Sequence, residues 1–119
     1  MNWLFVFIGG GLGASARYLI ARLIPHEGPS FPTATFLANV LSCIVLGYLL
    51  GYMLSKDLDT KWQLLFITGF CGGFSTFSTF SAESFKLLEA QAYGTLLIYI
   101  LSSILICLLS IWLGIKISS

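Results

Sequence analysis

Residues 69–81 read GFCGGFSTFSTFS, and this stretch decides how the chain can fold. Three glycines, four phenylalanines and five hydroxyl side chains occupy thirteen positions, and none of them is charged. The stretch lies inside an uncharged run of 21 residues, Trp62 to Ala82. A helix of this length crosses the ~30 Å hydrocarbon core of a bilayer at 1.5 Å per residue. We therefore expect the polar atoms of the stretch at membrane depth.

Two features of the stretch predict that its helix is broken near residues 70–76. Gly72 and Gly73 each weaken a helix by roughly 1 kcal/mol relative to alanine, and the Ser and Thr side chains after them can bond freed backbone groups. Irregular backbone inside a membrane survives only where protein buries it or where it lines a cavity. The break is therefore a candidate functional site. The alternative is a Gly/Ser-rich packing face on an unbroken helix.

The composition of the chain predicts an integral membrane protein. Of 119 residues, 57% are hydrophobic and 9% are charged, which leaves too few polar residues to cover a soluble domain. The uncharged runs predict four transmembrane helices in one domain, residues 1–119, with spans at about 3–24, 33–54, 62–88 and 93–115. A net charge of +1 without a basic cluster argues against nucleic acid as a partner.

Arg17 interrupts the first span. Gly9, Gly13 and Arg17 are four residues apart, so they share one stripe on which the glycines let another helix approach. The guanidinium then points into the assembly, as a vestibule charge for anions or a clamp on a carbonyl or carboxylate. The alternative is that Arg17 only anchors the end of the span. Glu83, at the end of the polar run, could partner Arg17 or cap its helix.

The second and fourth spans carry polar side chains at helical spacing. One stripe consists of Asn39, Cys43, Gly47 and Gly51, and the other of Tyr99, Ser103 and Cys107. Such groups either hydrogen-bond to a neighbouring helix or line a pore. For Asn39 the spacing slightly favours the first role.

Phenylalanines recur every three residues beyond the glycine pair, at Phe74, Phe77 and Phe80. A phenyl ring has a positive edge, so a ring turned edge-on beside hydroxyl donors attracts an anion without a cation to trap it. Packing against lipid or core is the more ordinary explanation of such a stripe.

Cysteine and histidine carry little functional information here. The three cysteines fall inside predicted spans without metal-ligand spacing, so we interpret them as small buried residues. His26 stands alone in the proline-rich turn at 25–32, where we expect it to be solvated.

The motifs together resemble those of one family. GGGLGASARY at 9–18, the Asn in TFLANVLSC at 35–43 and above all GFCGGFSTFSTFS resemble the CrcB/Fluc family of small fluoride channels. The resemblance covers nearly the whole chain. It implies an all-α membrane protein with four transmembrane helices per subunit, the third broken mid-membrane. It also implies an antiparallel, dual-topology homodimer in the lipid bilayer, with two fluoride pores.

The resemblance also implies roles for individual residues. The pore would be lined by Phe77, Phe80, Asn39, Ser78, Tyr99 and Ser103. The backbone carbonyls of Gly72 and Ser75 from both subunits would hold a structural sodium ion on the dimer axis. Cys107 stands where a further hydroxyl of the fourth-span track is expected. The implied function is passive export of cytoplasmic fluoride down its electrochemical gradient.

Three other classes of function were weighed against a fluoride channel. A small, dual-topology, proton-coupled multidrug exporter would need a carboxylate in the membrane, and none of the five acids lies mid-span. An enzyme would need a nucleophile–base pair or metal spacing, which the sequence lacks. A purely structural helix-packing protein needs only the small-residue stripes.

The basic residues predict the topology independently of the resemblance. Alternation of the spans puts Lys56, Lys61 and Lys116 on one side of the membrane. Arg22 and Lys86 lie on the other side, with Arg17 if it reaches the interface. Three against three is a balance that gives insertion little preference, because orientation follows the Lys/Arg bias. The chain is therefore expected to insert both ways.

Overall fold

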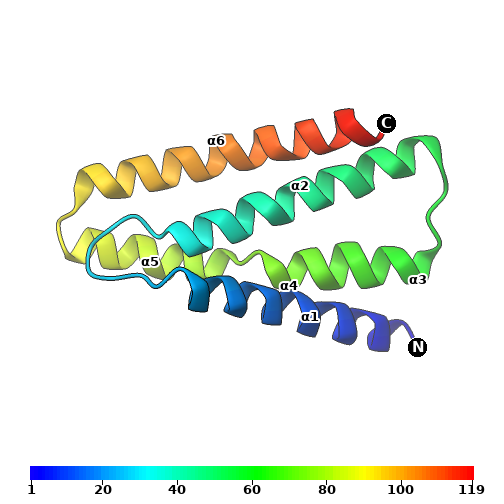
Figure 1. Ribbon diagram of the computed structural model, residues 1–119, viewed down its shortest axis with the longest axis horizontal. Helices are drawn as coiled ribbons and strands as arrows, with labels where there is room; N and C mark the ends of the chain where they lie inside the picture. Colours follow the sequence, from blue (N-terminus) through cyan, green and yellow to red (C-terminus); the bar gives the residue numbers. More distant parts are fainter.

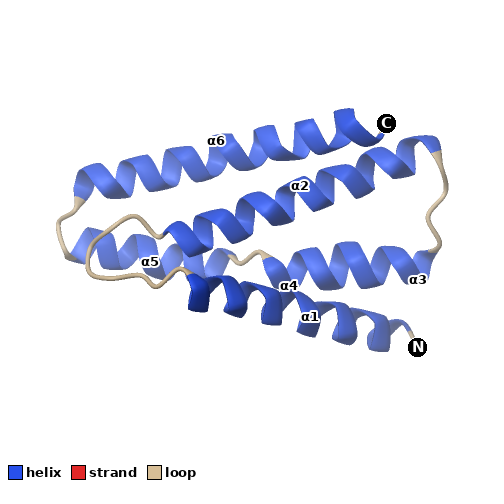
Figure 2. Ribbon diagram, in the orientation of Figure 1, coloured by secondary structure: helices blue, strands red, loops and turns tan.

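Helices make up nearly all of residues 1–119, which the computed structural model describes in full, and no strand is present (Figure 2). The long uninterrupted helices are α1 (Asn2–Leu23), α2 (Thr33–Ser55) and α6 (Tyr93–Ser118). A third membrane-length segment, Thr60–Glu89, lies between α2 and α6. It contains α3 (Thr60–Trp62), the π-helix η1 (Gln63–Cys71), α4 (Gly72–Phe74) and α5 (Phe77–Glu89). These four segments are long and apolar enough to cross a membrane, which confirms the prediction of four spans.

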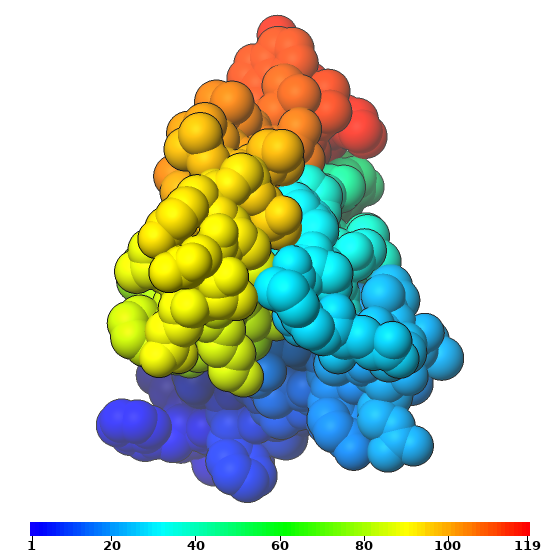
Figure 3. All heavy atoms as spheres, turned by 90° about the vertical axis from the view of Figure 1, so that its left-hand side faces the viewer, coloured from blue at the N-terminus to red at the C-terminus, as the bar shows by residue number.

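The four segments alternate in direction along the chain (Figure 1). Both termini lie at one end of the bundle, together with the 56–59 connection. The 24–32 and 90–92 connections lie at the other end, which faces the viewer in Figure 3. Lys56, Lys61 and Lys116 are therefore at one end, and Arg22 and Lys86 at the other, as the alternation predicted.

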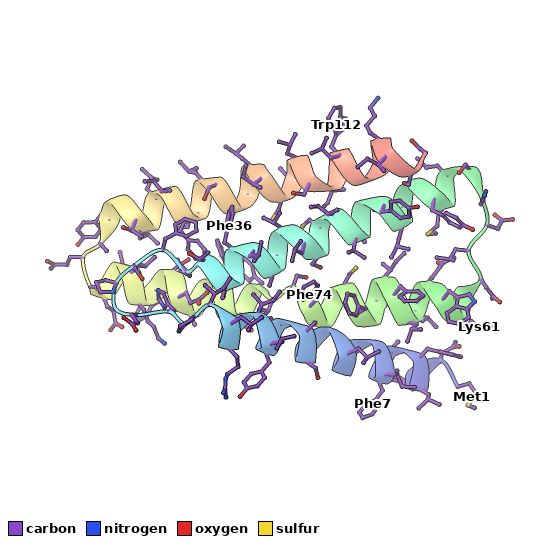
Figure 4. The ribbon with its side chains drawn as sticks, in the orientation of Figure 1. Met1, Phe7, Phe36, Lys61, Phe74 and Trp112 are labelled. Atoms are coloured by element: carbon purple, nitrogen blue, oxygen red, sulfur yellow. The ribbon has the colours of Figure 1, made fainter.

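The outer surface of the bundle is apolar. Phe7 and Trp112 point away from the bundle, whereas Phe74 lies inside it (Figure 4). Only 16 of the 119 residues are buried within the single chain. Phe7 is 77% exposed and Ile117 is 72% exposed, which suits contact with lipid tails rather than water.

Glycines bring α1 against the third segment. A Cβ atom added to Gly9 would overlap the Leu65 carbonyl oxygen, and one added to Gly13 would lie 2.7 Å from the Phe74 backbone nitrogen. A Cβ on Gly73 would lie 2.5 Å from the Gly10 carbonyl oxygen. The predicted close approach of another helix to the Gly9–Gly13 stripe is thus confirmed.

A second glycine-lined contact joins α2 and α6, which run side by side in the same direction (Figure 1). A Cβ on Gly47 would lie 2.8 Å from the Ile111 Cα atom, and one on Gly51 would lie 2.9 Å from the Ile115 Cα atom. The two contacts share one register, since each joins residues 64 positions apart.

Helical backbone is interrupted between α4 and α5 (Figure 2). Gly72 and Gly73 are both helical, and the extended residues are Ser75 (φ −92°, ψ 152°) and Thr76 (φ −151°, ψ 125°). The irregular backbone thus lies inside the range 70–76 given for the break, two residues beyond the glycine pair. Close packing explains why residue 73 is a glycine, because Gly10 leaves no room there for a side chain.

Side chains explain why the helix stops where it does. The Thr76 backbone N–H donates to the Asn39 Oδ1 atom of α2 at 3.2 Å instead of to a carbonyl of its own helix. The Ser75 hydroxyl donates back to the Cys71 carbonyl at 2.9 Å. Thr76 then caps α5, since its hydroxyl accepts from the Thr79 N–H at 3.4 Å.

Candidate functional site

A mainly apolar cleft that also carries several polar side chains opens beside the interruption. Its volume is about 260 Å³, and it lies between α2, the 75–77 backbone, α5 and α6. It is lined by Asn39, Cys43, Ser75, Thr76, Phe77, Phe80, Ser103, Ile104 and Cys107. None of these side chains carries a formal charge, so nothing in the cleft would hold an ion strongly.

The cleft continues the register of the α2–α6 contact. Asn39 and Ser103 are 64 positions apart, like Gly47 and Ile111, and Cys43 and Cys107 form the pair between them. The same register one turn further pairs Thr35 with Tyr99, and both residues are buried. The helix pair is thus polar along one half and glycine-lined along the other.

Asn39 has a fixed orientation. The Thr76 backbone N–H is a donor and needs an acceptor. The only acceptor of the Asn39 amide is its Oδ1 atom, so this atom makes the 3.2 Å contact. The Nδ2 amino group, with its two N–H donors, makes no hydrogen bond within the chain. A donor held in this way can replace one water of a desolvating anion.

Ser103 supplies a second donor, because its hydroxyl has no partner. The residue is only 6% exposed, and its Oγ atom makes no hydrogen bond in the structure. Ser84 is the other serine whose buried hydroxyl has no partner, but it does not line this cleft. Two further buried serines are satisfied: Ser42 donates to the Cys71 carbonyl at 3.1 Å, and Ser110 donates to the Ile106 carbonyl at 2.7 Å. A buried hydroxyl without a partner costs about 1–3 kcal/mol, so Ser103 is poised to bind something.

Aromatic rings form the α5 wall of the cleft. Phe77 and Phe80 have ring centroids 5.9 Å apart with an interplanar angle of 37°. Phe80 in turn lies 4.9 Å from the ring of Tyr99, which is completely buried. Phe77 is 79% exposed, so this side of the cleft is open in the single subunit.

Arg17 and Glu83 line a separate, smaller cavity of about 180 Å³ near the 24–32 connection. They find different partners. The Arg17 Nε atom donates to the Gly73 carbonyl at 3.2 Å, and a Glu83 carboxylate oxygen accepts from the Tyr99 hydroxyl at 3.1 Å. Arg17 is therefore the carbonyl clamp that was one of the expected roles, and Glu83 neither pairs with Arg17 nor caps a helix end.

The six expected pore residues are not all brought to the cleft. Phe77, Phe80, Asn39 and Ser103 line it. Ser78 is exposed, with its hydroxyl 3.0 Å from that of Thr76, and Tyr99 lies behind Phe80 with its hydroxyl on Glu83.

Four residues of the lining were not among the expected site residues: Cys43, Thr76, Ile104 and Cys107. Cys43 and Cys107 are only half-buried and line the cleft, whereas Cys71 is buried as predicted. Their place on the same stripes as Asn39 and Ser103 was the signal that could have found them. Thr76 was missed because nothing in the sequence shows that its backbone N–H needs an acceptor from another helix.

Several backbone carbonyls at the break have no hydrogen-bond donor. They are the oxygens of Gly72, Phe74, Ser75 and Thr76, whereas the carbonyls of Cys71 and Gly73 are bonded. Gly72 is exposed, and no heavy atom lies within 4 Å of a Cβ added there. Hard cations bind such oxygens, so the donor set fits Na⁺ in its chemistry.

The apolar surface, the four spans and the uncharged cleft at membrane depth define a multi-pass membrane protein. Residues 4–115 match the family model described as CrcB-like protein, Camphor Resistance (CrcB). The chain belongs to this family.

Similar curated proteins carry one common name. Fluoride-specific ion channel FluC of Azobacteroides pseudotrichonymphae is 45% identical over 111 residues, covering 92% of this chain and 89% of its own. Fluoride-specific ion channel FluC 2 of Rhodococcus jostii is 42% identical over 119 residues, covering the whole of both chains. The FluC of Pyrococcus abyssi is 40% identical, covering 93% of this chain and 90% of its own.

Proposed function

We propose that the chain is the subunit of a fluoride-selective ion channel. The observation that carries this proposal is the uncharged cleft with the unpartnered amino group of Asn39, an unpartnered Ser103 hydroxyl and phenyl rings. The relatives named as fluoride-specific ion channels support it. They lend no support to a proton-coupled exporter or to an enzyme.

Fluoride conduction needs a gradual exchange of water for protein donors. In the cleft, Asn39 offers N–H groups, Ser103 offers an O–H group, and Phe77 and Phe80 offer ring edges. Because the lining holds no cation, binding stays weak enough for the anion to leave. The chain performs no chemical step, so fluoride moves passively, and a cell would use it to export cytoplasmic fluoride down its gradient.

The cleft is completed in an antiparallel homodimer. Phe77 and Gly72 are exposed in the single subunit, and so are the hydroxyls of Ser78 and Ser81 at membrane depth. A second copy inserted in the opposite direction would cover these groups. The nearly balanced basic residues favour such insertion, although Arg17 is directed to Gly73 rather than to the interface.

The interruption at Ser75 and Thr76 lies at the middle of the membrane in this dimer, and each subunit thus has a broken third helix. The undonated carbonyls of Gly72 and Ser75 from the two subunits would hold one Na⁺ on the two-fold axis. Backbone carbonyl oxygens without a partner cost several kcal/mol each when they are buried in hydrocarbon. A bound Na⁺ would supply the missing partner and reduce this cost. Ser78 and Tyr99 act next to the pathway, Tyr99 by supporting the Phe80 ring.

Purified protein in liposomes tests the proposed function. Vesicles loaded with fluoride should release it in minutes when the potential is clamped, as read by a fluoride electrode. Matched vesicles loaded with chloride should retain their anion. Release of both anions at equal rates, or of neither, would contradict a fluoride-selective channel.

Two further measurements address the assembly. A reporter fused at Ser119 should be found on both faces of the membrane, and one fixed orientation would contradict antiparallel pairing.

Replacing sodium by a large organic cation during purification should lower the thermal stability of the dimer, whereas unchanged stability would contradict a structural role for the ion.

A further inference from the structure

Two thiols face each other in the cleft. Cys43 of α2 and Cys107 of α6 are 64 positions apart, in the register that joins Gly47 to Ile111 one turn away. Both thiols are free, and both line the cleft. Cys71 is the natural comparison, because it is only 4% exposed, lies on another element and does not line the cleft.

We propose that Cys43 and Cys107 form a binding site for a soft cation that accepts two ligands, such as Cu(I), and that occupation of this site closes the cleft. The binding part of the proposal stands on the thiol pair alone. The closure part rests on the proposed fluoride channel.

The ligand set decides which cations fit. Thiolate sulfur selects soft cations such as Cu(I), whereas carboxylate and carbonyl oxygens select Mg²⁺ or Ca²⁺. No cluster of three or more His, Cys, Asp or Glu side chains exists in the chain, so the four-ligand set that Zn²⁺ prefers is absent. Two sulfurs on facing helices suit a cation that needs only two.

Charge balance favours the same class. Binding of a monovalent cation between two thiols, with release of one proton to water, leaves one thiolate, one thiol and one cation. The net charge of the pair is zero before and after, so no unpaired charge is left at membrane depth, where it would be costly. No electron is transferred, and no bond other than the S–H bond is broken.

Closure follows from the position of the pair. Cys43 lies one helical turn from Asn39, and Cys107 lies one turn from Ser103, which are the two donors of the cleft. A cation bridging the two sulfurs would join the α2 and α6 walls of the cleft directly beside these donors. A bound metal would also fix the side chains of Cys43 and Cys107, which the anion must pass.

Silver ion is the probe, because it is soft, monovalent and not redox-active here, and because silver fluoride is soluble. The full-length protein in detergent is incubated with silver nitrate in chloride-free buffer and desalted, and bound silver is measured by elemental analysis. We expect one silver per chain in the wild type and in Cys71→Ser. We expect none in the double variant Cys43→Ser/Cys107→Ser. Silver retained by the double variant, or lost in Cys71→Ser, would overturn the site.

The second readout is fluoride efflux from liposomes, taken as the ratio of rates with and without silver for each protein. Silver should stop efflux in the wild type and in Cys71→Ser, and should leave the ratio near one in the double variant. Stoichiometric silver with unchanged efflux would overturn closure. Absence of efflux before any silver is added would contradict the channel function, while the silver count would still decide the binding site.

Discussion

The two halves of the α2–α6 contact share one register and differ in every other respect. Toward the end of the bundle that holds both termini, Gly47 and Gly51 let the α2 backbone approach the α6 backbone at Ile111 and Ile115. The helices touch there and leave no space. Toward the other end, the same 64-residue register holds polar pairs, and a cleft of about 260 Å³ opens beside them. The packing half fixes the position of the polar half.

The comparison separates hydroxyls that hold the fold from one that does not. Ser42 and Ser110 donate to carbonyls and lie behind or beyond the cleft. Ser103 has the same chemistry and nearly the same burial, yet its hydroxyl bonds nothing. The difference indicates that a serine holding two helices together is told from a serine lining a pathway by its hydrogen-bond partner and not by its residue type.

The largest expected effect is on the packing half. Gly47→Val would drive a side chain into the Ile111 backbone, so we expect a loss of at least about 3 kcal/mol and little folded protein. Size-exclusion chromatography and thermal melting in detergent measure this. Gly94→Ala is the control, because no heavy atom lies within 4 Å of its added Cβ. A well-folded Gly47→Val protein would show that this half does not fix the helices.

A smaller but functional effect is expected on the aromatic wall of the cleft. The double variant Phe77→Ile/Phe80→Ile keeps most of the volume and loses both ring edges. If each ring stabilises the anion by up to ~1.5 kcal/mol, fluoride efflux should fall by roughly a hundredfold. Elution volume of the variant should not change. Wild-type efflux in the folded variant would exclude ring–anion contacts from conduction.

The smallest effects come from the matched serines. Ser103→Ala should lower fluoride efflux by about fivefold, the value of ~1 kcal/mol, without loss of stability, because its hydroxyl has no partner to lose. Ser42→Ala should lower stability by about 1–2 kcal/mol, because it leaves the Cys71 carbonyl with one donor fewer. Flux and thermal melting of both variants check this, and the reversed pattern would contradict the comparison.

Much of the fold was predictable, because lipid imposes simple requirements. Uncharged runs gave the four spans, and stripes such as Gly9–Gly13 gave the close contacts. The residues of the interruption within the predicted range 70–76 were not predictable, since they depend on the Asn39 amide reaching Thr76 from another helix. Glycine propensity marked Gly72 and Gly73, which are helical, and at Gly73 the close contact with Gly10 leaves no room for a side chain.

The site was predictable as two stripes but not as one lining. Spacing placed Asn39 and Ser103 on helix faces, and only the shared register of α2 and α6 brings those faces together. The same register placed Cys43 and Cys107 in the cleft, where residue type alone had suggested burial. The partner of Arg17 was equally unpredictable, because the sequence allowed either a carbonyl or the Glu83 carboxylate. The structure shows that Arg17 donates to the Gly73 carbonyl.

Covalent modification of Cys107 in liposomes tests most directly whether the polar half is the conduit. A small methanethiosulfonate reagent is applied to the variant Cys43→Ser/Cys71→Ser, modification is measured by mass spectrometry, and fluoride efflux is recorded before and after. The account predicts that modification of Cys107 abolishes efflux, that a reductant restores it, and that the cysteine-free protein is indifferent to the reagent. Complete modification of Cys107 with unchanged fluoride efflux would contradict it.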